Sequence, residues 1–181
     1  MSRRFLGVLL TIFIFAFFLA MFRIIRLPAL MYFNSSPSLP IGFYMKVSDE
    51  TPLKRGDLVI LKVPEEMRQY VYERSWLKEG SPLLKIVYAI PGDTYLINSE
   101  AIFVNGKYVG GILKEDGSGW PLPRTRGSFT VRDGCFLPIA ARFQHSFDGR
   151  YFGQVSQSLI IARVKPLLIF PEWMEAMMND F

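Results

Sequence analysis

A serine and a lysine, far apart in the chain, are the residues best suited to hydrolytic chemistry. Ser38 lies between Pro37 and Pro40, whose rings fix two backbone torsions, so the segment can hold its hydroxyl outward with free backbone N–H groups beside it. Lys85 lies inside the apolar run 83–87. A serine hydroxyl needs a neighbouring base, and a lysine buried in such a run can lose its proton and become one. We therefore expect a serine nucleophile with a lysine base.

Each of these residues also has a simpler interpretation. The serine segment alone is typical of a Ser/Pro linker, and a lysine on an edge strand can extend its amine into water. Strand alternation places Leu83, Lys85 and Val87 on one face, and the pKa of the lysine falls only if that face is buried. His145 is the only histidine and is the alternative base, although a lone histidine in a turn is more often a surface residue.

A third polar segment, 145–153, is rich in polar residues and glycine. An ion pair between Asp148 and Arg150 could order a site from behind, and Ser146 could hydrogen-bond the lysine amine. A solvated turn is the alternative interpretation of this segment.

The N-terminal part of the chain contains a long uncharged run. Residues 5–22 carry no charge and one hydroxyl, and as a helix they would be about 27 Å long, close to the thickness of a bilayer core. Two arginines precede the run and two follow it, so the positive-inside rule gives no orientation. A cleaved signal peptide is the alternative, but its apolar part is usually only about 7–15 residues. We expect residues 1–26 to be an uncleaved membrane anchor with basic flanks.

Residues 27–181 are expected to form one mainly β catalytic domain. The chain has 181 residues of which 50% are hydrophobic, enough for one sizeable core. Residues 34–38, after a lead-in over 27–33, are predicted to be a loop or turn, 65–78 a short inserted helix, and 110–127 a long surface loop. Short β-branched and aromatic runs between turn residues predict the strands, at 42–47, 57–63, 83–90, 94–97, 101–104, 128–132, 135–138 and 159–164.

Charge and cysteine content narrow the possible partners. The net charge is +5, but the basic residues are scattered and four flank the apolar run, which favours a membrane surface over nucleic acid as the partner. Cys135 is the only cysteine, so an intrachain disulfide or a cysteine-cluster metal site is impossible. We expect no metal and no cofactor.

Three segments, in this order along the chain, resemble the type I signal peptidase family, the membrane-anchored Ser/Lys endopeptidases that remove leader peptides. Residues 34–44 are similar to the S-x-P-x-G-x-Y form of the TraF branch, the conjugative-transfer peptidases. Residues 85–93 are similar to the lysine box K-R-V-x-x-x-P-G-D, and residues 146–153 to the box S-x-D-S-R-x-x-G. The fold that this resemblance implies is a signal-peptidase-like, β-rich catalytic domain behind one N-terminal transmembrane helix.

The resemblance also implies a role for individual residues. Ser38 would be the nucleophile and Lys85 the general base. Ser36 would be an oxyanion donor together with the Ser38 N–H, and Ser146 would orient the lysine amine.

Behind these residues, Asp148 and Arg150 would support the site. Two positions depart from the family pattern: Gly149 stands where serine is usual, and His145 where asparagine is frequent. Both departures concern the residues around the dyad and not the dyad itself.

The function implied by the resemblance is cleavage of an exported precursor protein at the periplasmic face of a bacterial inner membrane, with small side chains at the first and third positions before the cut. The TraF branch implies a conjugative pilin precursor, which in some members is cyclised when an amine captures the acyl-enzyme. A general leader peptidase is the first alternative. A non-catalytic membrane component of a pilus or secretion assembly is an alternative from another class.

Overall fold

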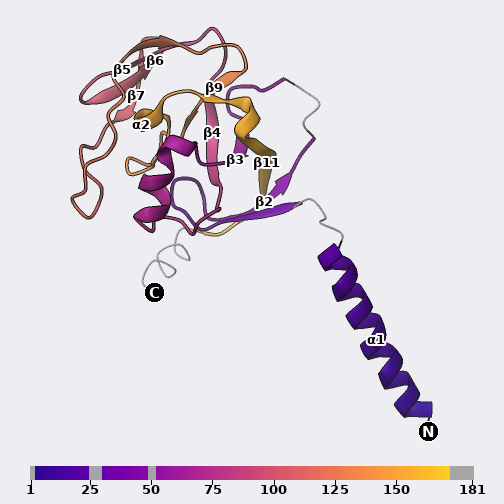
Figure 1. Cartoon of the computed structure of the whole chain (residues 1–181). Coiled ribbons are helices and arrows are strands. Elements are labelled where there is room, and N and C mark those ends of the chain that lie inside the picture. The colour runs from indigo at the N-terminus through magenta and orange to yellow at the C-terminus, as the bar shows by residue number, and fades with distance from the viewer. Residues whose placement is uncertain (1–2, 25–29, 49–51, 172–181) are drawn as a thin grey trace. The chain divides into compact units, whose positions relative to one another are not determined.

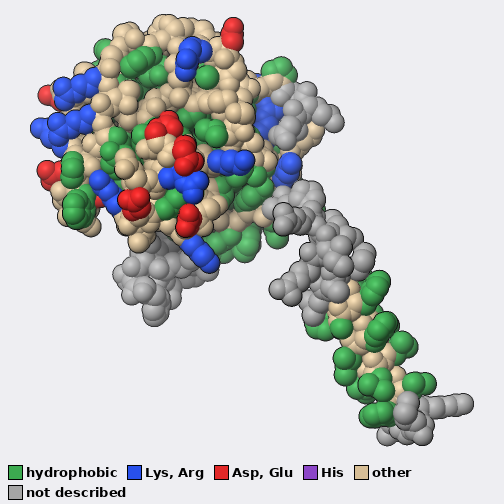
Figure 2. Space-filling view, viewed as in Figure 1, with side chains coloured by type: hydrophobic (Ala, Val, Ile, Leu, Met, Phe, Trp, Pro, Cys, Tyr) green, Lys and Arg blue, Asp and Glu red, His purple; other side chains and the backbone are tan. Residues whose placement is uncertain are grey.

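The computed structural model describes residues 3–24, 30–48 and 52–171 (Figure 1). The chain divides into two compact units, Met1–Leu30 and Met31–Phe181. The first unit contains helix α1, Arg3–Ile24, whose described side chains are hydrophobic or uncharged (Figure 2). Within the described residues, no helix meets both the length and the apolarity needed to cross a membrane.

The second unit is built on a seven-stranded antiparallel sheet with the strand order β1-β2-β11-β3-β4-β9-β10. β11, the last strand in the described part of the chain, lies between β2 and β3 and so joins the two parts of the sheet. The strands are β1 Met31–Asn34, β2 Gly42–Lys46, β3 Leu58–Leu61, β4 Leu83–Ala89, β9 Cys135–Ile139, β10 Val155–Ser156 and β11 Ile160–Ile169.

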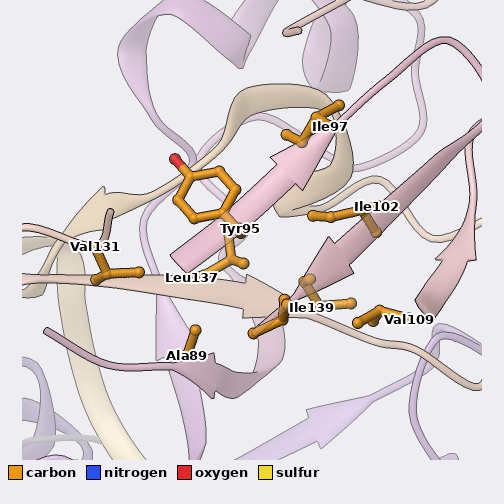
Figure 3. Close-up of a cluster of buried hydrophobic side chains, with 9 residues drawn as sticks. Ala89, Tyr95, Ile97, Ile102, Val109, Val131, Leu137 and Ile139 are labelled. Atoms are coloured by element: carbon orange, nitrogen blue, oxygen red, sulfur yellow. The ribbon is translucent and has the colours of Figure 1, made fainter. Parts of the chain in front are cut away.

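A smaller antiparallel sheet has four strands in the order β7-β6-β5-β8. Its buried side chains, with Tyr95 and Ile102 among them, pack against Leu137 and Ile139 of β9 and form the core between the two sheets (Figure 3). The strands are β5 Thr94–Ile97, β6 Ala101–Val104, β7 Lys107–Gly111 and β8 Gly127–Thr130.

Both faces of the large sheet are buried at β3. Val59 and Leu61 point into a core that also takes Val71 from the inserted segment, whereas Ile60 packs with Tyr44 on the other face. An apolar strand buried on both faces positions its neighbour β4 firmly, because neither strand can shift register without exposing one of the two cores.

The inserted segment differs from the predicted helix over 65–78. It contains a 3₁₀ turn at Glu65–Met67 (η1) and a π-helical turn at Gln69–Glu73 (η2), in which the N–H of Trp76 donates to the carbonyl of Val71 at 3.0 Å. The wider turn keeps Val71 in the core while Trp76 is only partly buried. Apolar spacing could predict a helical segment here but could not distinguish an i to i+5 bond from an i to i+4 bond.

Other segments also depart from the sequence-based prediction. Residues 31–34, for which no strand was predicted, form β1. The expected loop 110–127 begins with the end of β7 and is narrowed by a bridge between Glu115 and Pro121. Two further helical turns, α2 Gly149–Phe152 and η3 Gln157–Leu159, flank β10. The remaining predicted strands are present within a few residues of the predicted bounds.

Candidate active site

The serine loop between β1 and β2 is organised by one side chain amide. Nδ2 of Asn34 donates to the carbonyls of Ser36 and Leu39, each at 2.9 Å, and of Pro40 at 3.1 Å. Its Oδ1 accepts from the N–H of Ser36 at 3.2 Å. An amide can satisfy several loop groups at once because it carries both donors and an acceptor. The loop is therefore fixed from its inside, and the nucleophile candidate lies at its turn.

The glycine and the tyrosine of the serine motif have separate structural reasons. Gly42 has φ of 154°, and a Cβ atom there would lie 2.2 Å from the carbonyl oxygen of Leu168. No other residue fits so close to the backbone of β11. The hydroxyl of Tyr44 donates to the carbonyl of Pro40 at 2.6 Å and so ties β2 back to the loop that precedes it.

Ser38 is buried, with 6% of its surface exposed. Its Oγ lies 3.0 Å from Oγ of Ser36, and its backbone N–H donates to that same Oγ at 3.4 Å. The two serines that the sequence singled out are thus in contact.

Lys85 lies on β4, an inner strand between β3 and β9, and is 4% exposed. Its Nζ donates to Oγ of Ser146 at 2.9 Å. Desolvation lowers the pKa of the Lys85 amine to about 8, with a rise from the charge of Asp148 and a further decrease from that of Arg150 as smaller effects. An edge-strand lysine in water, the simpler interpretation, does not describe this residue.

Asp148 and Arg150 form a buried ion pair, each at most 1% exposed. Nε of Arg150 donates to Oδ1 and Nη2 to Oδ2 of Asp148, both at 2.9 Å. The guanidinium also donates to the carbonyls of Phe143 at 2.8 Å and Ser146 at 3.2 Å, and Oδ2 of Asp148 accepts from the N–H of Ala140 at 2.9 Å. The pair therefore holds the loop that carries the hydroxyl bound to Lys85.

The two departures from the family pattern have different surroundings. A Cβ at Gly149 would lie 2.8 Å from the carbonyl oxygen of Pro138 and 2.8 Å from Cδ1 of Leu137, so this backbone leaves no room for a serine. His145 is exposed, and its ring packs on Phe143 with centroids 5.9 Å apart.

The P-G-D part of the lysine box stabilises the turn after β4. Hydrogen bonds from Arg55, then from Asn105 and from the N–H of Ile90, outweigh desolvation and lower the pKa of Asp93 to about 2. Asp93 thus links the turn to the small sheet. Its role is structural and keeps the end of β4 in place.

One cavity of about 570 Å³ is lined both by the serine loop and by the segment that contains Ser146, the partner of Lys85. Ser36, Ser38 and Ser146 line it together with His145. In the described part of the chain no hydrogen bond joins Ser38 to Lys85, whose amine is held by Ser146. Over the same residues, no group of three or more His, Cys, Asp or Glu side chains is arranged to hold a metal ion.

Sequence reasoning missed some of the residues that shape this site. Asn34 stands within the quoted serine segment, but its role depends on contacts with carbonyls two to six residues ahead that no spacing rule indicates. Trp76 is another residue whose role was missed. It lines the cavity from the inserted segment and was predicted only as part of a helix.

The fold and the site define a β-rich protein with a buried lysine beside a serine-lined cavity, and comparison with known proteins identifies its family. The family model described as "Signal peptidase, peptidase S26" matches residues 2–169. The chain therefore belongs to the signal peptidase S26 family.

Relatives with assigned names are plasmid transfer proteins. "Plasmid transfer protein TraF" of Escherichia coli is 32% identical over 145 residues, covering 75% of this chain and 81% of that protein. "Conjugal transfer protein TraF" of Agrobacterium tumefaciens (strain 15955) is 32% identical over 146 residues, covering 76% and 81%. Among solved structures, a signal peptidase I from Enterococcus faecalis V583 is 19% identical with a TM-score of 0.38, covering 64% of this chain and 98% of that one.

Proposed function

We propose that the protein is a serine endopeptidase with a Ser38/Lys85 dyad that cleaves an exported precursor. The observation that carries the proposal is the buried amine of Lys85, which is held by Ser146, a residue that lines the same cavity as Ser38. A lysine with a pKa near 8 is neutral often enough near neutral pH to accept a proton. Burial of a lysine without a carboxylate bound to its amine lowers stability, which favours a catalytic reason for the arrangement.

The proposed reaction proceeds through an acyl-enzyme. When a peptide enters the cavity, the neutral amine of Lys85 takes the proton of Ser38 Oγ, and that oxygen attacks the scissile carbonyl carbon. The peptide nitrogen leaves with the proton, and Ser38 holds the acyl group as an ester. Water then attacks the ester carbonyl carbon and gives a proton to Lys85. The bond to Oγ breaks, and Lys85 passes that proton to the leaving Ser38 Oγ, which releases the acid product and regenerates the serine and the neutral lysine.

Two donors would stabilise the oxyanion of the tetrahedral intermediate. The backbone N–H of Ser38 and the hydroxyl of Ser36 lie beside the nucleophile, and in the free protein they bond to each other. A carbonyl oxygen arriving at Ser38 would take both donors in place of that mutual contact. Removal of one such donor typically costs about 10²–10³ in rate.

The substrate is proposed to be a precursor of a conjugation apparatus, namely a pilin. The support is that two relatives at 32% identity are named as plasmid transfer and conjugal transfer proteins. A general leader peptidase would instead accept unrelated exported precursors. The product is linear if water takes the acyl group, and cyclic if an amine of the same chain does.

We further propose that residues 5–22 anchor the protein in the inner membrane, with the catalytic domain on the periplasmic face. The run has no charge. The catalytic domain has an apolar surface of its own at β1 and the end of β11, where Met31, Phe33, Leu167 and Leu168 are each about half exposed. Exposed apolar clusters of this kind often contact membranes, and this one flanks the serine loop.

The test is co-expression of a candidate pilin precursor with the wild type, with Ser38→Ala and with Lys85→Ala, followed by mass spectrometry of the pilin. Processing is expected with the wild type only, and Lys85→Arg should also fail because a guanidinium stays protonated. A product lighter than the trimmed linear chain by one water would report cyclisation.

Each variant must be recovered in normal amounts for the comparison to count. Near-normal processing by Ser38→Ala or Lys85→Ala would exclude the dyad. Absence of processing of any precursor by the wild type would favour the non-catalytic component of a pilus or secretion assembly.

A further inference from the structure

Two segments that are far apart in the chain form one wall of the serine-lined cavity. The first is the π-helical insertion and the residues after it, 69–77, and the second is the loop 113–122. We call them together the clasp wall. A second hollow of about 440 Å³ lies on the other side of this wall, and Trp76 and Asp116 line both spaces. The clasp wall therefore separates the site from a neighbouring surface hollow.

Arg74 joins the two segments. Its guanidinium donates to Oδ2 of Asp116 at 2.9 Å and to the carbonyl of Pro121 at 3.0 Å. It also lies over the rings of Tyr70, at 4.8 Å from the centroid, and Trp76, at 5.5 Å. Two hydrogen bonds in different directions and stacking on aromatic rings are a combination that arginine provides and lysine does not.

Asp116 completes the connection from the loop side, with 8% of its side chain exposed. Its Oδ1 accepts from the N–H groups of Ser118 and Trp120, each at 2.9 Å. Desolvation raises the pKa of Asp116, but these backbone hydrogen bonds and the contact with Arg74 outweigh it, and the net pKa is lowered. The ion pair is therefore charged near neutral pH, and each charge is matched within the clasp wall.

Most side chains that the clasp wall presents to the cavity are apolar and bulky. The clasp wall presents Val71, Trp76 and Leu77 from the insertion, and Leu113 and Leu122 from the loop. A cavity near 570 Å³ falls in the range of about 300–1,000 Å³ that holds drug-sized ligands, far more than an alanine side chain fills. Because Arg74 and Asp116 are paired with each other, we expect apolar contact to supply the free energy of binding.

The clasp wall also touches the residue next to the lysine partner. The ring of Trp76 meets that of Phe147 edge to face with centroids 5.2 Å apart, and Phe147 follows Ser146 directly. A substrate side chain placed against Trp76 is thus placed against the loop that holds the amine of Lys85.

We propose that Arg74 and Asp116 form a clasp that holds this wall as a subsite for a bulky apolar side chain of the precursor, near the scissile bond. The inference rests on the proposed peptidase function and adds to it the class of side chain recognised. Arg74 is a specificity-determining residue in this scheme and takes no part in proton transfer.

The test uses the full chain in detergent and a series of peptides taken from the cleavage region of a processed precursor, with leucine or alanine placed at successive positions around the cut. For the wild type, we expect leucine to raise kcat/KM about tenfold over alanine at one position at least, mainly through KM. Arg74→Ala should lose that preference because kcat/KM falls much more for the leucine peptide than for the alanine peptide, while the pH profile keeps its midpoint. Arg74→Lys should lie between the two.

Arg68→Ala is the matched control, because Arg68 lies next to the same turn but pairs with Glu65 and Glu79 at the surface; it should keep the preference. The proposal is overturned if the wild type shows no leucine preference, or if Arg74→Ala slows all peptides equally.

A separate measurement applies if the proposed peptidase function fails and no peptide is cut. Binding of the same leucine and alanine peptides to the wild type and to Arg74→Ala is then followed by tryptophan fluorescence. Tighter binding of the leucine peptide by the wild type alone supports the clasp. Equal binding of both peptides contradicts it.

Discussion

The buried amine of Lys85 makes the activity depend on pH in a definite direction. Because desolvation lowers its pKa to about 8 from 10.5, the neutral base is a minor form at pH 7 and the major form above pH 8. We expect kcat/KM to rise about tenfold per pH unit below 8 and to level off above it. Steady-state cleavage of a short peptide between pH 6 and 9.5 measures the midpoint.

The alternative base, His145, supplies the control for this profile. Since it is exposed and packs only on Phe143 among the ring contacts of the described residues, His145→Ala should keep both the midpoint and most of the rate. A midpoint that disappears with this substitution would transfer the proton-accepting role to the histidine.

Single residues of the site were predictable to different degrees. Ser38 and Lys85 could be chosen because a proline-flanked serine and a lysine within an apolar run are unusual in local sequence, and their motifs lie in a recognisable order. Asn34 could not, because its amide acts on carbonyls of a loop whose shape exists only after β1 and β2 pair. The contact between Lys85 and Ser146 spans 61 residues, so the polar segment 145–153 offered it only as one alternative, and the family resemblance was needed to assign Ser146 that role.

At the scale of elements, the serine loop depends on the close approach of β2 and β11. Gly42→Ala should destabilise the domain and lower activity more than it lowers stability, because the added Cβ would meet the backbone of Leu168 and displace the loop that carries Ser38. The free energy of unfolding is expected to fall by about 1–3 kcal/mol, the usual range for a strained backbone position. Urea unfolding and peptide cleavage measure the two effects.

Gly110→Ala is the matched control on β7. A Cβ there would make only an ordinary contact, 3.5 Å from Nη1 of Arg150, so stability and activity should stay near those of the wild type. Equal losses in both variants would mean that the narrow gap between β2 and β11 is not the cause.

Elements were predictable where short runs of apolar and β-branched residues lie between turn residues, as in β3 and β4. The spacing of apolar residues does not predict the structure where particular backbone hydrogen bonds determine the conformation. The turn Gln69–Glu73 is π-helical, and after it the carbonyl of Val71 accepts from the N–H of both Trp76 and Leu77, an arrangement that apolar spacing does not encode. The loop 110–127 was predicted as surface because of its Gly and Pro content, yet Leu122 is buried and lines the cavity.

At the scale of the whole molecule, the three cores are all drawn from residues after Met31, so the catalytic unit does not need α1 for its packing. We expect a variant lacking residues 2–26 to cleave a short peptide with the kcat of the full chain. We also expect the full chain to stay in the membrane fraction after an alkaline carbonate wash, and the shortened variant to be released.

The proposed orientation is tested in the same cells. Protease added to spheroplasts should degrade the catalytic domain of the full chain while a cytoplasmic marker protein stays intact. Release of the full chain by carbonate would contradict anchoring by residues 5–22, and protection of the domain in spheroplasts would contradict the periplasmic placement.

The position of β11 also determines when the enzyme can become active during its own synthesis. The loop of Ser38 is enclosed by the last described strand, with Ile169 opposite Gly42 and the N–H of Phe170 donating to the carbonyl of Ile41 at 2.9 Å. Such distant pairings form late, because the ends of a long segment must first be brought together. A nascent chain that still lacks β11 therefore has Ser38 on an open loop. Under the proposed function, we expect proteolytic activity only after β11 has left the ribosome.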